Sequence, residues 1–179
     1  RAVGGNFRLD PLQAALLRIK LGHYDRYTRA RQANAAYYLE RLSALEGVEP
    51  AAPAHCCCAK AQEEALAEAR IVLPACYEHN EHIWNQFTLR VREPGQRDLL
   101  RAHLAEREIG SEVYYPLTMD QQECFAELPA ISREGNGVAH QLAGEVLSIP
   151  IYPELEREMQ DWVVSAITEF LGIETPVEE

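Results

Sequence analysis

The residues best suited to bind an anion lie near the beginning of the sequence, where Gly4, Gly5, Asn6 and Arg8 occur close together. Glycine lets the backbone come close to a ligand, while an amide and a guanidinium donate hydrogen bonds to phosphate or carboxylate oxygens. The segment has neither the spacing of a dinucleotide-binding fingerprint nor that of a P-loop. It is a candidate anion site, and an ordinary turn with a solvated arginine is an equally good interpretation of these residues alone.

A second group of polar and aromatic residues, His82, Trp84, Asn85 and Gln86, falls in a segment predicted to be a strand. Alternate side chains of a strand face opposite sides of its sheet, so half of this group would face a pocket or an interface. Trp84 is therefore a candidate for contact with a ligand. The alternative is that its indole belongs to the core and that backbone groups satisfy Gln86.

Tyr114 and Tyr115 end another predicted strand, and Pro116 then opens a polar loop. Loops at strand ends project phenol and amide groups into clefts, so both tyrosines are candidates for ligand contact. Asp120, later in the loop, is chemically able to act as an acid or a base, although a loop carboxylate is more often solvated. The nucleophile elbow GxSxG and the zinc motif HExxH are missing. We therefore assign no catalytic residue to this chain.

The lysines and cysteines of this sequence are not placed as expected for a nucleophile, a disulfide framework or a metal site. Lys20 and Lys60 are the two lysines, and both fall where we expect an exposed surface, without the desolvation that activates a lysine nucleophile. The cysteines are odd in number, and Cys56, Cys57 and Cys58 form one run, which is unlike a disulfide framework. Adjacent side chains point apart and lack the two-residue gap of a zinc site, so we expect reduced thiols and no metal.

The composition argues against several classes of protein. The net charge of −11 would repel a phosphate backbone, so we expect no nucleic acid partner. A local cluster of arginines can still bind a nucleotide, because net charge describes the whole surface and not one pocket. No apolar stretch reaches the length of a membrane span, and the first residues lack the apolar core of a signal peptide. We expect a globular protein of the cytoplasm that does not insert into a membrane.

Two helices are expected to position the first segment. Asp10 and Pro11 form a strong helix start, and Gly22 is placed to end a short helix with one apolar stripe. From Asp25 to about Leu45 the sequence contains no glycine or proline, which predicts one long helix. The apolar stripe of this helix is too narrow for full burial, so we expect it to bridge two bodies.

The remainder predicts an α+β fold class, a small antiparallel sheet packed with helices. Strands are expected at 70–73, 83–91 and 111–115, because these segments carry β-branched and aromatic residues. The stretch 50–69 changes composition and is expected to be a surface excursion.

Three further helices are expected, between Gly95 and Gly110, at about 138–147 and at about 154–171. The last helix has an apolar stripe that we expect to be buried, with Met159 and Trp162 as part of it.

Five blocks of the sequence, in order, resemble the signature blocks of the DegT/DnrJ/EryC1/StrS aminotransferases. They are GGNFRLDPLQAALLRIKL, HIWNQFTLRV, RDLLRAHLAEREIG, YYPLTMDQQECF and LSIPIYPEL. Their order and spacing match the C-terminal half of that family. The resemblance covers almost the whole chain except the excursion at 50–69.

The resemblance implies the smaller C-terminal domain of a fold-type I transferase that depends on pyridoxal 5'-phosphate. In such enzymes an earlier lysine holds the cofactor, and no residue of this chain matches it. Asn6 and Arg8 match a block that reaches the cofactor phosphate of a partner subunit, which implies a homodimer with shared active sites. Tyr115 matches a tyrosine–proline turn at the nucleotide-sugar entrance, with Tyr114 and Trp84 as further candidates for substrate contact.

The resemblance also divides the chain into 1–24, the end of the cofactor domain, 25–47, the connecting helix, and 48–179, the small α+β domain. The complete protein is expected to transfer an amino group from a donor such as glutamate to a nucleotide-linked keto sugar, and this chain to be inactive alone. A noncatalytic dimerisation or binding module and a family dehydratase are the alternatives. The start at Arg1 without a methionine favours a fragment.

One departure from the family concerns the loop after the tyrosine–proline turn. Relatives commonly carry histidine where this chain has Asp120. A carboxylate there removes a possible donor to a substrate phosphate or hydroxyl, so we expect the change to bear on substrate preference.

Overall fold

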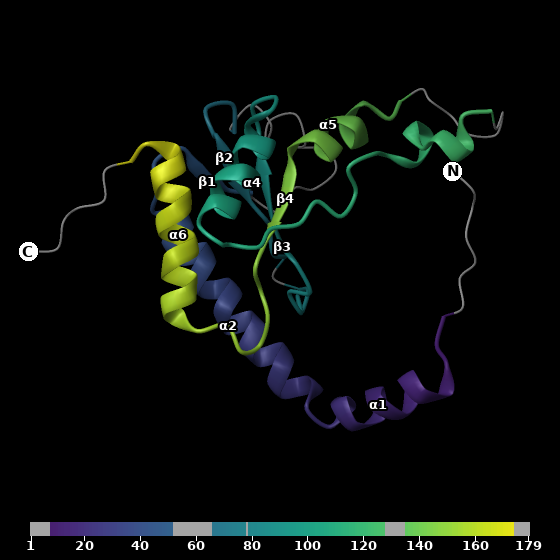
Figure 1. The fold of residues 1–179 in the computed structure, drawn as a ribbon. Coiled ribbons are helices and arrows are strands. Elements are labelled where there is room, and N and C mark those ends of the chain that lie inside the picture. Colours follow the sequence, from purple (N-terminus) through teal and green to yellow (C-terminus); the bar gives the residue numbers. More distant parts are fainter. Residues whose placement is uncertain (1–7, 52–65, 78, 128–134, 174–179) are drawn as a thin grey trace, which may run out of the picture.

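The computed structural model describes residues 8–51, 66–77, 79–127 and 135–173 (Figure 1). In chain order the elements are α1 (Pro11–Leu21), α2 (Tyr24–Ser43), β1 (Val48–Pro50), β2 (Ile71–Leu73), β3 (Phe87–Val91), α4 (Gln96–Glu106), the 3-10 turns η2 (Met119–Gln121) and η3 (Glu123–Phe125), α5 (Gly137–Glu145), β4 (Val146–Ile149) and α6 (Arg157–Leu171). One small sheet packed with helices confirms the predicted α+β class. Asn6, Lys60 and the Cys56–Cys58 run lie outside the described residues.

The sheet has the order β1-β2-β3-β4. β3 pairs antiparallel with β2 on one side and with β4 on the other, where Leu89 lies opposite Leu147. β1 joins the edge parallel to β2, with Val48 opposite Ile71. The sheet is therefore mixed, whereas the sequence predicts antiparallel pairing alone. Parallel neighbours need a crossover, and the long stretch of chain between β1 and β2 allows one.

The largest differences from the sequence prediction concern three elements. The helix expected to reach residue 147 ends at Glu145, because the next four residues pair with β3 as strand β4. The strand expected at 111–115 is reduced to a single bridge between Glu112 and Ser148. The strand expected from residue 83 begins at Phe87, since Trp84 has a φ of 52° and cannot continue an extended backbone.

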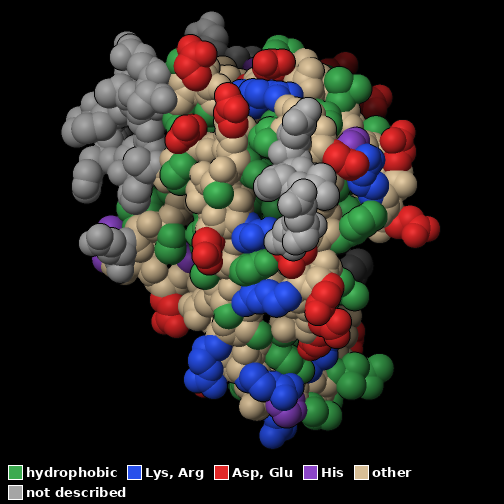
Figure 2. Space-filling model, turned by 90° about the vertical axis from the view of Figure 1, so that its left-hand side faces the viewer, with side chains coloured by type: hydrophobic (Ala, Val, Ile, Leu, Met, Phe, Trp, Pro, Cys, Tyr) green, Lys and Arg blue, Asp and Glu red, His purple; other side chains and the backbone are tan. Residues whose placement is uncertain are grey.

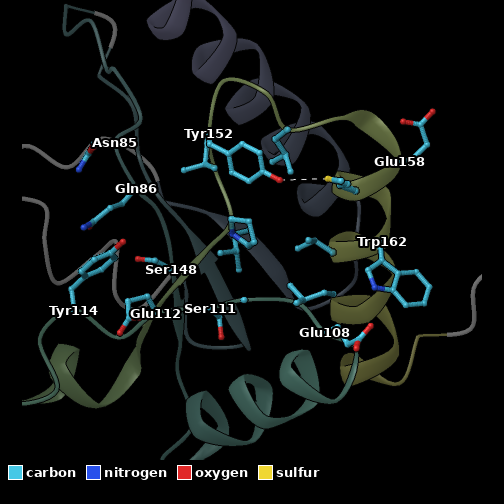
Figure 3. Close-up of a pocket in the computed structure, with 18 residues that line it drawn as sticks. Asn85, Gln86, Glu108, Ser111, Glu112, Tyr114, Ser148, Tyr152, Glu158 and Trp162 are labelled. Atoms are coloured by element: carbon cyan, nitrogen blue, oxygen red, sulfur yellow. Dashed lines mark hydrogen bonds between the residues drawn. The ribbon is translucent and has the colours of Figure 1, made fainter. Parts of the chain in front are cut away.

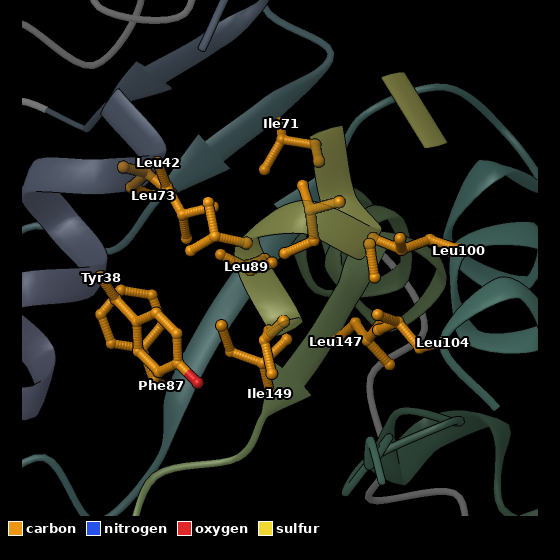
Figure 4. Close-up of a cluster of buried hydrophobic side chains, with 14 of the residues drawn as sticks. Tyr38, Leu42, Ile71, Leu73, Phe87, Leu89, Leu100, Leu104, Leu147 and Ile149 are labelled. Atoms are coloured by element: carbon orange, nitrogen blue, oxygen red, sulfur yellow. The ribbon is translucent and has the colours of Figure 1, made fainter. Parts of the chain in front are cut away.

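The core lies between the sheet and the helices α2, α4 and α6. Phe87, Leu89 and Val91 alternate along β3 as buried residues, as expected for a strand with one face on the core. Helix α6 packs against α4 and α2. Other buried side chains of this cluster are Tyr38, Leu42, Ile71, Leu73, Leu100, Leu104, Leu147 and Ile149 (Figure 4).

Helix α6 buries most of the predicted stripe, including Val163, Ala166 and Ile167, but not all of it. Gln160, Val163 and Ile167 face the core, whereas Met159 is 50% and Trp162 56% exposed. The prediction that Met159 and Trp162 are buried is therefore wrong. A helical stripe has edges that periodicity alone cannot locate, and these two residues lie at the edge of this one.

The beginning of the described chain extends from the body (Figure 1). Asp10 caps α1 by accepting a hydrogen bond from the Gln13 amide at 2.9 Å, and no residue of α1 is buried. The apolar side chains of Leu12 and Ile19 are 73% and 69% exposed. In α2 the buried residues all belong to its second half, and its predicted role as a bridge between two bodies stays a prediction.

Tyr38 places a polar hydroxyl in the core, and substituting this residue tests whether the hydroxyl stabilises the fold. Its hydroxyl is buried and makes no hydrogen bond of normal geometry among the described residues; burial raises the pKa of Tyr38, and the nearby Gln160 side chain partly opposes that rise. An unpaired buried hydroxyl contributes no stability, so Tyr38→Phe is expected to keep the free energy of unfolding or to raise it by about 1 kcal/mol, measured by urea titration. Gln160→Met is the contrast, with an expected loss of about 1–3 kcal/mol, because the buried Gln160 amide donates to the Asn34 carbonyl at 2.9 Å. A clear loss in Tyr38→Phe would show that the hydroxyl has a partner.

Candidate functional site

A first cleft of about 930 Å³ lies between α6, the end of β4 and the segment 108–114 (Figure 3). Its aromatic and apolar lining comes from three places in the sequence, with Tyr114, Tyr152, Met159 and Trp162 as its largest side chains. The Tyr152 hydroxyl donates to the Met159 sulfur at 3.4 Å. Aromatic rings and a thioether form an adaptable surface for the flat or apolar part of a ligand.

The charged groups of the first cleft are carboxylates, and its neutral polar groups are amides and the hydroxyls of Ser111, Ser148, Tyr114 and Tyr152. Glu108, Glu112 and Glu158 supply negative charge, and Asn85 and Gln86 supply amides. No lysine, arginine or histidine occurs among the described residues that line it. The cleft therefore suits hydroxyl groups, amides or a positively charged group better than it suits a phosphate.

A second cleft of about 870 Å³ lies where α1 and α2 meet the body. Arg18, Lys20 and Arg31 line it, with Glu154 as its acidic residue. Figure 2 shows Lys and Arg side chains at the lower end of the molecule, where α1 lies in Figure 1. This cleft is thus the more favourable of the two for a phosphate.

Asn85 and Tyr152 line both clefts, so these clefts are neighbours. Arg31 fixes the backbone next to both clefts. Its Nη1 donates to the carbonyls of Ile151 at 2.7 Å and of Trp84 at 3.1 Å. The Asn34 side-chain amide donates to the Tyr152 carbonyl at 2.9 Å. Helix α2 therefore positions the residues that separate an acidic, aromatic cleft from a basic one.

The candidate residues from the sequence fall in different places. Tyr114 lines the first cleft, whereas Tyr115, the next residue, is 77% exposed and is not among the described residues that line either cleft. Trp84 is buried, and its ring stacks on Phe87 at 5.4 Å between centroids, which favours the alternative of a core residue. Arg8 is exposed just before α1, with a φ of 52°. The binding roles of these residues remain predictions.

Sequence reasoning missed several residues of the first cleft. Tyr152 was not singled out, and Met159 and Trp162 were assigned to the core. A signal was present for Asn85 and Gln86, which belong to the polar group around His82, although Trp84 was the residue chosen from it.

Asp120 lies in the turn η2 with both carboxylate oxygens paired. The Thr118 hydroxyl donates to Oδ1 at 2.6 Å, and His140 Nε2 lies 2.7 Å from Oδ2. The Thr118 bond is the main cause, and His140 a further one, of a pKa of Asp120 that is lowered to about 2. Asp120 is therefore charged at neutral pH, which does not suit a general acid.

The described residues do not form a complete cofactor or metal site. Lys20 is exposed on α1, so it lacks the buried surroundings of a lysine that would hold pyridoxal 5'-phosphate, whereas Arg8 suits its phosphate. Residues 8–51, 66–77, 79–127 and 135–173 contain no cluster of metal-ligating side chains. Within the same ranges no helix is both long and apolar enough to span a membrane.

Comparison with known proteins yields one family model. The model of the DegT/DnrJ/EryC1/StrS aminotransferase family matches residues 1–168. A pleiotropic regulatory protein of Geobacillus stearothermophilus is 37% identical over 94% of this chain and 38% of its own length. A dTDP-3-amino-3,4,6-trideoxy-alpha-D-glucose transaminase of Streptomyces venezuelae is 34% identical over 93% of this chain and 37% of its own length.

Solved structures give the same picture. DesV of S. venezuelae matches with a TM-score of 0.71 and 32% identity, over 94% of this chain and 38% of DesV. A DegT DnrJ EryC1 StrS aminotransferase of Brucella abortus matches with a TM-score of 0.67 and 26% identity, over 92% of this chain and 36% of its own. The chain thus spans well under half of the length of the proteins that it resembles.

Proposed function

The chain belongs to the DegT/DnrJ/EryC1/StrS aminotransferase family, and from this premise we propose that it is the C-terminal part of an enzyme that aminates nucleotide-linked keto sugars. The observation that carries the proposal is the 34% identity, along 93% of the chain, to the dTDP-3-amino-3,4,6-trideoxy-alpha-D-glucose transaminase of Streptomyces venezuelae. Relatives named as transaminases of dTDP-linked and UDP-linked sugars support the substrate class.

In the proposed reaction, the amino group of glutamate moves to the ketone carbon of the sugar. The ketone oxygen is in effect exchanged for it, so glutamate becomes 2-oxoglutarate and the keto sugar becomes an amino sugar. Aminotransferases of this family depend on pyridoxal 5'-phosphate, which when bound supplies the stabilisation of negative charge on carbon that the exchange needs. The sugar keeps its nucleotide throughout.

The proposed contribution of this chain to the cofactor is the segment before α1. Asn6 and Arg8 would donate hydrogen bonds to the phosphate of a cofactor held by the partner subunit of a homodimer. The exposed position of Arg8 and the exposed apolar residues of α1 support a partner surface at this end of the molecule. We expect the complete dimer to work in the cytoplasm.

The proposed contribution to the substrate is the mouth of the first cleft. Tyr114 and Tyr115 would contact the nucleotide sugar, since a phenol ring packs against a sugar or a base while its hydroxyl bonds to a polar group. The glutamates of this cleft would accept from sugar hydroxyls. Its lack of basic lining argues that the diphosphate lies outside it, nearer the basic second cleft.

Retention of the cofactor tests the proposal that this chain supplies phosphate contacts but not the lysine that holds the cofactor. The 179-residue chain is expected to retain no stoichiometric pyridoxal 5'-phosphate after gel filtration, because Lys20 is exposed and Asn6 and Arg8 supply only phosphate contacts. The complete protein should elute yellow with about one cofactor per subunit. A stable coloured complex of the 179-residue chain alone would overturn the proposed division.

Two alternatives to transamination predict different experimental results. A noncatalytic binding module gains some support from the relative named a pleiotropic regulatory protein, and it predicts that the complete protein also elutes without cofactor. A family dehydratase predicts a histidine where an aminotransferase has the cofactor lysine, so the full coding sequence, read with the intact mass of the purified protein, separates it from transamination.

A further inference from the structure

Residues 113–119, which carry Tyr114 and Tyr115, lie between two attachments to the body. At the first, the backbones of Glu112 and Ser148 exchange hydrogen bonds of 3.0 and 2.9 Å, which join this segment to β4. The Ser148 hydroxyl is in turn within 2.9 Å of the Thr88 hydroxyl on β3. This end of the segment is therefore joined to β4 by two backbone hydrogen bonds, and β4 is joined to β3 at the same residue.

The second attachment is the contact between Asp120 and His140, with Oδ2 and Nε2 2.7 Å apart. The Asp120 side chain is 8% and the His140 side chain 34% exposed, so water reaches the carboxylate only slightly. Nε2 donates to the carboxylate whether the imidazole carries one proton or two, provided that the single proton lies on Nε2. The contact crosses 20 positions of the sequence and joins η2 to α5.

Helix α5, which carries His140, is attached to the sheet by side-chain contacts of its own. Near the end of α5, Glu145 pairs with Arg90 of β3 at 2.5 Å, with side chains that are 9% and 18% exposed. Arg97 of α4 donates to the carbonyls of Ala143 at 3.2 Å and Val146 at 3.3 Å. Asp120 and His140 thus connect the tyrosine segment to α5, which is itself joined to the inner strand β3.

We propose that Asp120 and His140 are positioning residues that fix the segment 113–119, and thereby set where Tyr114 and Tyr115 meet the sugar nucleotide. For its catalytic consequence this inference rests on the proposed function, because the tyrosines matter to a reaction only if the substrate passes them. The Asp120 carboxylate thus has a partner, a histidine supplied from α5. The pair would tune substrate binding without touching substrate or cofactor.

The test uses the complete protein and three variants of the pair. His140→Leu removes the donor, His140→Gln keeps an amide N–H near the position of Nε2, and Asp120→His combined with His140→Glu reverses the pair. Val138→Ala, on the same helix at a side chain that is 71% exposed, is the matched control. Amide hydrogen exchange of peptides covering 113–119 reports the attachment, and steady-state kinetics with a nucleotide-linked keto sugar reports its use.

In His140→Leu, exchange of the Thr118 amide, which donates to Gln121 Oε1 at 3.2 Å, is expected to accelerate roughly tenfold, the size of effect expected on losing a charge-assisted hydrogen bond. The KM for the keto sugar should rise by a similar factor, while the rate of the half-reaction with glutamate stays within about twofold. His140→Gln and the reversed pair should recover most of both effects, and Val138→Ala should show neither.

Unchanged exchange in His140→Leu would overturn the positioning role. Faster exchange with an unchanged KM would show that the segment is held but does not bear on the substrate, which overturns the proposed consequence. If the unaltered complete protein turns over no keto sugar, the proposed function fails, and the exchange measurement still decides whether the pair fixes the segment.

Discussion

Arg8→Ala in the complete protein is expected to weaken the binding of pyridoxal 5'-phosphate by roughly 10- to 100-fold and to leave the fold intact. A guanidinium on a phosphate makes charge-assisted hydrogen bonds worth about 1.5–3 kcal/mol, which corresponds to this range of affinity. Arg8 is exposed and lies before the first turn of α1, so its loss leaves the core unaltered. Spectrophotometric titration of the cofactor-free protein measures the dissociation constant.

Two further variants make the Arg8 result specific. Arg8→Lys keeps the charge but not the planar pair of donors, so its affinity should lie between that of the unaltered protein and that of Arg8→Ala. Arg101→Ala removes an exposed arginine from α4, away from the anion segment, and should change nothing. Equal affinities of Arg8→Ala and Arg101→Ala would remove Arg8 from the cofactor site.

Leu104→Ala is expected to lower the free energy of unfolding by about 2–5 kcal/mol, because it leaves a cavity in the core. Leu104 is fully buried, on the face of α4 that packs against the sheet and α6. Leu99→Ala is the control on the same helix, and its loss should stay within about 1 kcal/mol because Leu99 is 56% exposed. Urea unfolding followed by circular dichroism measures both.

The outcome for Leu104 has a direct consequence for the fold. A loss in Leu104→Ala no larger than in Leu99→Ala would mean that α4 does not pack on the sheet as described. The structure would then fail to explain the position of the segment 108–114, which follows α4 and lines the first cleft.

Helices α1 and α2 follow closely from local sequence signals. Asp10 and Pro11 begin α1, and α2 starts within one residue of the predicted Asp25. Caps, stops and the 3.6-residue periodicity act within a few residues of each other, so sequence alone reveals them. The same holds for α4, which begins after Gly95 with a φ of 81°.

The sheet was less predictable because its strands depend on partners far away in the sequence. The residues of β4 continue a helical pattern, and only their pairing with β3 makes them a strand. The parallel position of β1 likewise depends on β2, across the excursion whose composition was visible but whose path was not. Propensity is a weak guide wherever such pairing decides the conformation.

The residues of the candidate site could likewise be predicted only where the signal was local in the sequence. Tyr114 was identifiable from its place at the end of a β-rich segment before Pro116, and it does line a cleft. Trp162 and the contact between Asp120 and His140 were not identifiable, because one depends on which edge of α6 the core leaves exposed and the other on two elements meeting in space. Residue types identified candidates for the site, whereas only the fold shows which of them lie close together.

Transfer of nitrogen is the most direct test of the central claim. The complete protein would be incubated with pyridoxal 5'-phosphate, glutamate carrying isotopically labelled nitrogen and a dTDP- or UDP-linked keto sugar, and the sugar product analysed by mass spectrometry. We predict an amino sugar that contains the label and still carries its nucleotide, together with an equal amount of 2-oxoglutarate. A product without nitrogen, or no product from either nucleotide class in a protein that binds the cofactor, would contradict the assignment as a nucleotide-sugar aminotransferase.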